Sequence, residues 1–246
     1  MENQELFRRA EDLCRRSAGK WQITHTSFLT PAECLQLQRS FRPEDGVSMH
    51  FFGGHDDAER RVLFFLPDGV EQSEIRTALC AVHYQAWFGE PGHRDYLGSL
   101  LASGISRDRL GDILISGTEA WVFCLPGVLG HLLSIDRIGR ISVKAEEADF
   151  SLLPPPAQEM KTVSFTVQSM RLDAVAAGMF RLSRSACAER IREGMLSLNY
   201  QVCLKIDAPV KEGDVISLRG YGKGSIAGLG GSSRKGRQFV NAEIRL

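Results

Sequence analysis

The spacing of apolar residues near the start of the chain predicts two helices. Apolar positions recur at intervals of three and four over residues 3–17, with arginines beside the stripe, which is typical of an amphipathic helix. A second helix is expected after Thr30, because Pro31 and Glu33 follow it in the order of a capped helix start. This helix is expected to end near Phe41.

Two strand-like stretches follow, at residues 47–52 and 61–66, separated by a turn rich in Gly and Asp. The order helix, helix, hairpin predicts an N-terminal α+β subdomain over residues 1–74.

From residue 75 the pattern predicts strand, helix, strand, strand, helix, strand. This β-α-β-β-α-β order is that of the ferredoxin-like fold, which RNA-recognition-motif (RRM) domains also use. We assign residues 75–148 to this module. Its expected strands are 78–87, 111–116, 118–125 and 140–146, and its expected helices run from about 93 to 103 and from 128 to 137.

A proline-rich linker is expected at residues 149–160, because three consecutive prolines fit neither a helix interior nor a central strand. The remaining residues, 161–246, are expected to form a third domain, so the fold class is multi-domain α+β. Its expected elements are a strand at 162–167, helices from 170 and at 182–193, short strands at 195–198, 201–205 and 210–216, a flexible basic loop at 220–237 and a closing strand at 239–245.

Composition is that of an ordinary globular protein, 43% hydrophobic and 24% charged, with zero formal net charge. The charge is unevenly distributed: from Phe165 onward thirteen Lys/Arg stand against seven Asp/Glu, and before it seventeen against twenty-three. A basic C-terminal part favours a polyanionic partner. No apolar run reaches the length of a membrane span and no signal peptide is visible, so we expect a cytoplasmic protein that does not bind membranes.

The 161–246 segment resembles the S4 RNA-binding domain. The matching positions occur in the family's order and spacing: Arg171-Leu172-Asp173, Ser183-Arg184, Gly194 with Leu196 and Leu198, Asn199, Lys205, and Gly213-Asp214-Val215-Ile216. The resemblance implies that this domain binds the shape and backbone of folded RNA.

Candidate RNA-binding residues follow from these positions. Ser183 can cap the second helix, and Arg184 can grip a phosphate with its forked guanidinium. Asp173 is expected to pair with an arginine or cap a helix. The full candidate set is Arg171, Arg181, Ser183, Arg184, Arg190, Arg192, Asn199, Lys205, Lys223, Arg234, Lys235 and Arg237. The alternative for each charge is an ordinary solvated surface.

The sequence departs from the S4 pattern at one turn, where the family's Asn-Gly is Asn199-Tyr200. A two-residue type I′ turn needs positive φ at both central positions, which is costly for tyrosine. We therefore expect another turn type or a longer loop. Tyr200 is either a packing residue or a stacking side chain.

Over nearly the full length, the chain resembles the YlmH-type family of ribosome-associated S4-domain proteins, which includes the photosystem II S4-domain proteins. The central part of this resemblance is carried by residues 93–101, Gly104-Ile105, Arg107 and residues 110–114. It implies docking on structured rRNA of the large ribosomal subunit, in handling obstructed subunits that carry peptidyl-tRNA. Arg94, Arg107 and Arg109 are candidates for a second RNA contact, while Trp121 and Phe123 are expected to be core.

Two alternatives stay open: an RNA-modifying enzyme with its catalytic module in residues 1–150, and a protein-binding adaptor in cell division or photosynthetic assembly. No catalytic grouping stands out, and we expect no enzyme activity, no cofactor and a monomer. The six cysteines lack zinc spacing and are expected to be small apolar residues. His50 and His55 with Asp56-Asp57 are a poor candidate for a metal site, because they lie on a strand and a turn without further ligands.

Overall fold

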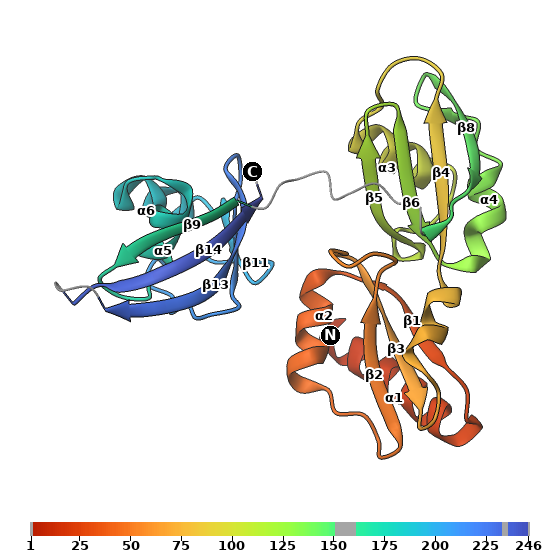
Figure 1. Cartoon of the computed structure of the whole chain (residues 1–246), viewed down its shortest axis with the longest axis horizontal. Coiled ribbons are helices and arrows are strands. Elements are labelled where there is room, and N and C mark those ends of the chain that lie inside the picture. Colours follow the sequence, from red (N-terminus) through yellow and green to blue (C-terminus); the bar gives the residue numbers. More distant parts are fainter. Residues whose placement is uncertain (1, 151–160, 233–235, 246) are drawn as a thin grey trace. The chain divides into compact units, whose positions relative to one another are not determined.

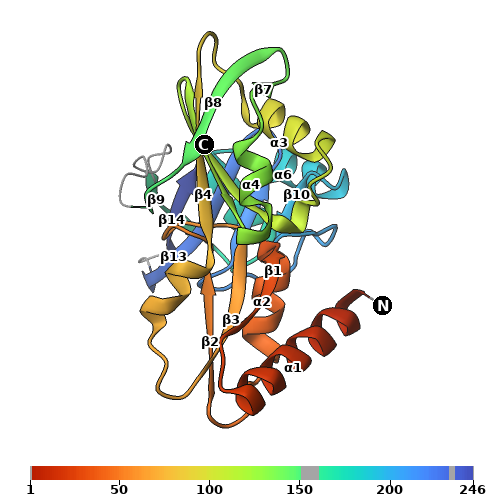
Figure 2. The same cartoon turned by 90° about the vertical axis from the view of Figure 1, so that its right-hand side faces the viewer.

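The computed structural model describes residues 2–150, 161–232 and 236–245 (Figures 1 and 2). The described residues have a mixed α/β structure with three sheets, and the chain divides into two compact units, residues 1–157 and 158–246. Most of the expected linker, residues 151–160, lies outside the described residues. Within the described part, no helix is long and apolar enough to span a membrane.

The first unit begins with a three-stranded antiparallel sheet in the order β1-β3-β2. Helices α1 and α2 cover one face of this sheet, where Ala10, Cys14 and Leu37 form a core with Leu63 and Phe65. The elements are α1 (Glu2–Lys20), β1 (Thr24–Leu29), α2 (Pro31–Ser40), β2 (Val47–Phe52) and β3 (Arg61–Pro67).

The start of α2 confirms the predicted cap. The Thr30 hydroxyl accepts a hydrogen bond from the backbone N–H of Glu33, and the Glu33 carboxylate accepts one from the backbone N–H of Thr30.

Strand β1 was not predicted, so the expected order of helix, helix and hairpin was wrong. The strand contains the polar residues Thr24, Thr26 and Ser27, all of which are buried. Their burial is possible because the hydroxyls are satisfied: Thr24 donates to the carbonyl of Leu13 (2.7 Å), and Thr26 accepts from the N–H of Leu63 (3.0 Å). A strand that is polar in sequence and buried in structure gives no alternating apolar pattern.

The second sheet of this unit has the predicted β-α-β-β-α-β element order, extended by one short strand. The sheet is antiparallel in the order β5-β6-β4-β8-β7. Helices α3 and α4 lie on one side of it (Figure 2), over a core that contains Tyr84, Tyr96, Leu100 and Leu132. The elements are β4 (Cys80–Ala86), α3 (His93–Ala102), β5 (Leu110–Ser116), β6 (Glu119–Cys124), α4 (Leu129–Leu133), β7 (Arg137–Ile138) and β8 (Ile141–Glu147), with 3-10 turns η1 (Gln72–Ala78), η2 (Arg107–Arg109) and η3 (Pro126–Val128).

The helix expected at residues 128–137 was too long. Helix α4 ends at Leu133, and residues 137 and 138 form β7, which pairs with β8 around Gly139. Gly139 has a φ of 58°, so the chain reverses there instead of continuing a helix.

The two sheets of the first unit share an apolar core. Phe28 and Phe64 of the first sheet pack in one cluster with Phe123 of the second sheet and with Leu79, which directly precedes that sheet's β4. The predicted subdomains 1–74 and 75–148 therefore lie in one compact unit. We call the boundary between these two sheets the seam.

Asp112 ties the seam together with polar contacts. Its carboxylate accepts hydrogen bonds from the backbone N–H groups of Glu59 (2.7 Å) and Arg60 (3.1 Å) and lies 3.3 Å from Nε2 of His55. Burial opposes ionisation of Asp112, but the adjacent His55 and the hydrogen bonds from the two N–H groups outweigh it and lower the pKa of this carboxyl.

The C-terminal unit is a six-stranded sheet in the order β11-β10-β12-β13-β14-β9, with helices α5 and α6 packed against it (Figure 1). The first strand, β9, pairs with the last, β14, over seven residue pairs. The elements are β9 (Lys161–Val167), α5 (Leu172–Phe180), α6 (Arg184–Arg192), β10 (Leu196–Leu198), β11 (Gln201–Val202), β12 (Val215–Leu218), β13 (Gly222–Ser232) and β14 (Gln238–Arg245).

The flexible loop expected at 220–237 was wrong over most of its length, because β13 occupies Gly222–Ser232 and pairs on both sides. Glycine weakens strand signals in a sequence, but here it is required sterically. A Cβ on Gly224 would lie 2.8 Å from the sulfur of Met179 and 2.9 Å from the carbonyl oxygen of Glu243.

Candidate nucleic-acid interface

Two arginines of the C-terminal unit share one carboxylate. Arg171 precedes α5 and Arg184 opens α6. Nε of Arg171 donates to Oδ1 of Asp173 (3.1 Å), and Nη2 of Arg184 donates to Oδ2 (2.7 Å). The Asp173 side chain is 7% exposed, whereas those of Arg171 and Arg184 are 42% and 58% exposed. We call these three residues the Arg-Asp-Arg cluster.

The electrostatics of this cluster favour a fixed ion triad. Burial raises the pKa of Asp173, but the hydrogen bonds from Arg184 and Arg171 outweigh this and lower the pKa below its ordinary value. One carboxylate faces two guanidinium groups, so the cluster carries a net positive charge at neutral pH. Asp173 holds both arginines in position while much of each arginine side chain stays exposed, an arrangement that suits binding of phosphate oxygens.

Ser183 caps α6 as predicted, with its Oγ accepting from the backbone N–H of Ala186 at 3.1 Å. Arg181 ends α5 in the left-handed region, with a φ of 54°, and its side chain is exposed. Both residues belong to the connection between the two helices, and Ser183 lies directly before Arg184 of the cluster.

Lys205 lies on a segment that is attached to the start of α5. The carbonyls of Ile206 and Ala208 accept hydrogen bonds from the backbone N–H groups of Asp173 (3.1 Å) and Leu172 (2.9 Å). This attachment brings the exposed Lys205 to the same end of α5 as the cluster.

The side chain of Asn199 forms hydrogen bonds within the C-terminal unit. Its amide nitrogen donates to Oδ1 of Asp214 (2.9 Å), and its amide oxygen accepts from the N–H of Val215 (3.1 Å). The residue thus organises the β10–β11 turn, and its side-chain amide is engaged by the protein.

The expectation of another turn type or a longer loop was wrong. Leu198 pairs directly with Gln201, so only Asn199 and Tyr200 connect the strands. Their φ angles are 50° and 66°, the positive pair that a type I′ turn requires.

The remaining basic candidates differ in their surroundings. Arg190 stacks on the ring of Tyr221 (4.7 Å) and donates to its hydroxyl (3.1 Å), so it supports the fold. Arg192 and Arg237 are exposed, and Nζ of Lys223 lies 4.9 Å from the ring centre of Tyr200. Arg234 and Lys235 lie outside the described residues.

In the first unit, the three arginines proposed as a second RNA contact differ in their surroundings. Arg94, in the first turn of α3, and Arg109, in η2, are exposed. Arg107 instead donates to the backbone carbonyls of Leu110 (2.7 Å) and Gly111 (3.0 Å). Burial, together with the nearby Arg60, lowers the pKa of Arg107 to about 10. Arg107 therefore acts as a structural clamp.

On the helix-free face of the second sheet, the two aromatic residues of β6 are buried. Trp121 and Phe123 are 7% and 0% exposed, which confirms the expectation that they are core. Trp121 is stacked on His83 at 4.8 Å, and the ring nitrogens of His83 lie 3.1 Å from Glu119 and 3.4 Å from Glu146. Trp121 and Phe123 therefore offer no exposed ring on which an RNA base could stack.

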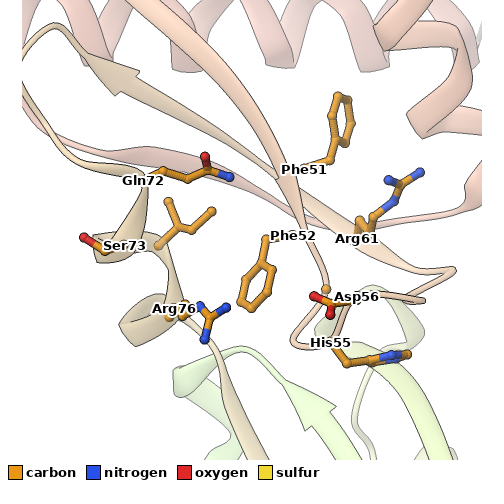
Figure 3. A pocket seen from close by; sticks show the side chains of 10 residues that line it. Phe51, Phe52, His55, Asp56, Arg61, Gln72, Ser73 and Arg76 are labelled. Atoms are coloured by element: carbon orange, nitrogen blue, oxygen red, sulfur yellow. The ribbon is translucent and has the colours of Figure 1, made fainter. Parts of the chain in front are cut away.

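A polar cavity of about 410 Å³ lies beside the β2–β3 connection and η1 (Figure 3). Arg61, Arg76 and His55 contribute basic groups to its lining, and Asp56 an acidic one. Among the described residues, no group of three or more His, Cys, Asp or Glu side chains is placed to hold a metal ion. His55 instead contacts Asp112 and packs on Phe123 at the seam.

The sequence alone left two contributors to this interface undetermined. Asp173 was expected to pair with an arginine or to cap a helix, and in the structure it accepts hydrogen bonds from two arginines. The contact between Tyr200 and Lys223 joins residues far apart in the chain, and no local signal predicts it.

Comparison with known proteins agrees with this architecture. Residues 2–69 match the family model "YlmH, N-terminal", and residues 70–152 match the model "Putative RNA-binding domain in YlmH". The solved structure of the cell division protein ylmH from Streptococcus pneumoniae shares the fold, with a TM-score of 0.52 and 18% identity over 61% of this chain and 93% of that one.

The "Ribosome-associated protein quality control protein P2" of Bacillus subtilis (strain 168) is 31% identical over 227 residues, covering 91% of this chain and 88% of that protein. On this evidence the chain belongs to the YlmH family.

Proposed function

We propose that this protein is a non-catalytic factor that binds structured rRNA of the large ribosomal subunit. In this proposal it acts in quality control of stalled complexes that carry peptidyl-tRNA. The name of the Bacillus subtilis relative and the family model over residues 70–152 support a ribosome-associated, RNA-binding role. The C-terminal unit is, in this proposal, an S4-type RNA-binding domain.

The observation that carries the proposal is the Arg-Asp-Arg cluster. A nearly buried carboxylate fixes two arginines whose side chains are about half exposed. Pre-positioned arginines bind phosphate with less loss of side-chain freedom than mobile ones. Ser183, which precedes Arg184, and Lys205, on the segment attached to the start of α5, extend its polar, basic surface, and Arg181 is a further exposed basic residue of the same unit.

The surroundings of the cysteines support the non-catalytic part of the proposal. Burial raises the pKa of Cys124 to about 12 and of Cys187 to about 11, and it also raises the pKa of Cys14, Cys34 and Cys80. A nucleophilic cysteine needs a lowered pKa, so these five thiols are poorly suited to catalysis.

The test is co-sedimentation of the full chain with ribosomes on a sucrose gradient at low and high salt. The wild-type protein is expected with the large subunit at low salt and to be released as salt rises, because phosphate contacts weaken with ionic strength. Arg184→Glu is expected to remain at the top of the gradient.

A matched control reverses one exposed charge outside the candidate set, Arg219→Glu, which is expected to co-sediment nearly as the wild type does. Migration of the wild type at the top of the gradient under all conditions would contradict the proposal. So would equal losses in the two variants, because the binding would then follow overall charge.

A further inference from the structure

The β10–β11 turn holds a tyrosine in a backbone conformation that tyrosine rarely adopts. Tyr200 has a φ of 66° in a two-residue connection. A side chain with a Cβ is disfavoured in the left-handed region, and a bulky one there is a genuine outlier. Such outliers cluster at functional sites.

The residue type explains the positive φ of Asn199 but not that of Tyr200. Asn199 tolerates the left-handed region, and both ends of its amide are hydrogen-bonded. Tyr200, in contrast, belongs to none of the apolar clusters found among the described residues, whereas Tyr221 packs against the core of the same unit. Core packing therefore does not offset the strain at Tyr200.

The ring of Tyr200 is partly exposed and carries a cation on one side. Nζ of Lys223, on β13, lies 4.9 Å from the ring centre, which is cation–π geometry. An aromatic face beside a lysine combines the two contacts that unpaired nucleotides use, namely stacking of the base and neutralisation of the phosphate.

Chain connectivity keeps this pair near the Arg-Asp-Arg cluster. The segment after β11 leads from Tyr200 to Ile206, whose carbonyl accepts from the N–H of Asp173. Six residues span at most about 21 Å. One folded RNA can therefore reach both places, with Lys205 between them.

We propose that Tyr200 and Lys223 form a stacking site for an unpaired base of the RNA that the Arg-Asp-Arg cluster binds by its backbone. This inference rests on the proposed RNA-binding function and adds a contact that reads unpaired structure. The partly exposed ring takes one face of the base, and Lys223 meets the adjacent phosphate.

The experiment compares the full-length wild type with Tyr200→Gly and Tyr200→Phe. The probe is an RNA hairpin with one bulged 2-aminopurine, and the control probe is the same hairpin without the bulge. Glycine restores an unstrained turn and removes the ring, so its melting temperature is expected at or above that of the wild type. Loss of one stacked base is expected to weaken binding of the bulged hairpin about 5- to 150-fold.

Tyr200→Phe keeps the stacking face, so its affinity is expected within about threefold of the wild type. Quenching of the 2-aminopurine by the wild type and by Tyr200→Phe, but not by Tyr200→Gly, would complete the support. The hairpin without the bulge is expected to bind all three proteins similarly.

Two results would overturn the stacking site while leaving the proposed function intact. One is unchanged binding by Tyr200→Gly while Arg184→Glu loses it, which would assign the exposed hairpin, with Val202 and Leu204, to a protein partner. The other is weakened binding together with a lower melting temperature, which would make Tyr200 a structural residue. A wild type that binds neither hairpin nor ribosomal RNA would refute the proposed function and this inference together.

Discussion

Asp173 and Arg184 are joined by a 2.7 Å hydrogen bond between two consecutive helices, although one is nearly buried and the other is more than half exposed. The buried partner gains from the contact, since a carboxylate out of water needs donors. The exposed partner, Arg184, is held in one orientation by the same contact. The same pair thus stabilises the C-terminal unit and orients a basic side chain.

Asp173→Asn is therefore expected to lower both stability and RNA affinity. At neutral pH, the loss of the charged hydrogen bonds is expected to cost about 1–3 kcal/mol of unfolding free energy. Arg184 remains but loses its anchor, so binding of ribosomal RNA is expected to weaken by about tenfold. Urea denaturation and a filter-binding assay check the two effects, and intact stability would contradict the anchoring role.

The same variant has a defined pH dependence. The folded pKa of Asp173 is lowered, so its stabilising contribution is present above the unfolded pKa of about 3.9 and is lost as pH falls through the folded value. The stability difference between wild type and Asp173→Asn is expected to be largest near neutral pH and to shrink below about pH 4. Denaturation curves at several pH values measure it, and a difference that grows in acid would refute it.

Arg107 and Arg109 are two residues apart but are expected to respond differently to substitution. Arg107→Gln removes donors from two backbone carbonyls and is expected to cost about 1–3 kcal/mol. Arg109→Gln changes an exposed side chain and is expected to stay within about 0.5 kcal/mol of the wild type. Thermal unfolding compares them, and equal melting temperatures would argue against the clamp.

Gly111 marks a tightly packed point of the seam. A Cβ there would lie 2.6 Å from Cε1 of Phe28 and 3.0 Å from the Cβ of Phe123, so Gly111→Ala is expected to destabilise the first unit by about 1–3 kcal/mol. Gly98→Ala is the matched control, because nothing lies within 4 Å of its added Cβ and alanine favours helix α3. The control is expected to be neutral or slightly stabilising, and a similar loss in both variants would contradict the packing argument.

Thiol labelling tests whether the buried cysteines react as slowly as their raised pKa values predict. With a pKa of about 12, Cys124 is expected at pH 8 to have a thiolate fraction about a thousandfold below that of a free cysteine, and burial slows its reaction further. Cys187, with a pKa of about 11, is expected to behave similarly. Mass spectrometry after brief iodoacetamide treatment of the native protein checks this, and rapid modification of either residue would contradict it.

Much of the fold follows from local sequence signals, and the exceptions have identifiable causes. The Thr30 cap and the β-α-β-β-α-β order were predictable because capping residues and apolar periodicity act over a few positions. Strand β1 was missed because hydrogen bonds, not apolar side chains, accompany its burial. Strand β13 was missed because its glycines reflect contacts with Met179 and β14, which are distant in the sequence.

In the candidate site, too, local sequence motifs predicted some features, whereas others depend on tertiary contacts. The Arg-Leu-Asp and Ser-Arg motifs predicted Arg171, Ser183 and Arg184 as neighbours on one surface, and the structure brings them together. The sequence did not predict that Arg107 clamps backbone carbonyls or that Arg190 stacks on Tyr221, because both roles depend on tertiary contacts. Charge alone does not separate a binding arginine from a structural one.

The pairing of β9 with β14 has a consequence for how the protein forms during synthesis. The sheet of the C-terminal unit needs its last strand to lie between β9 and β13, so the pairings that complete it are long-range in sequence. Such topologies fold slowly, because distant segments must meet before their contacts form. The described strands of the first unit all come from residues 24–147. Folding on the translating ribosome is therefore expected in two stages. Until β14 emerges, the edges of β9 and β13 stay unpaired and the core that β14 completes stays open, so a chaperone can bind there.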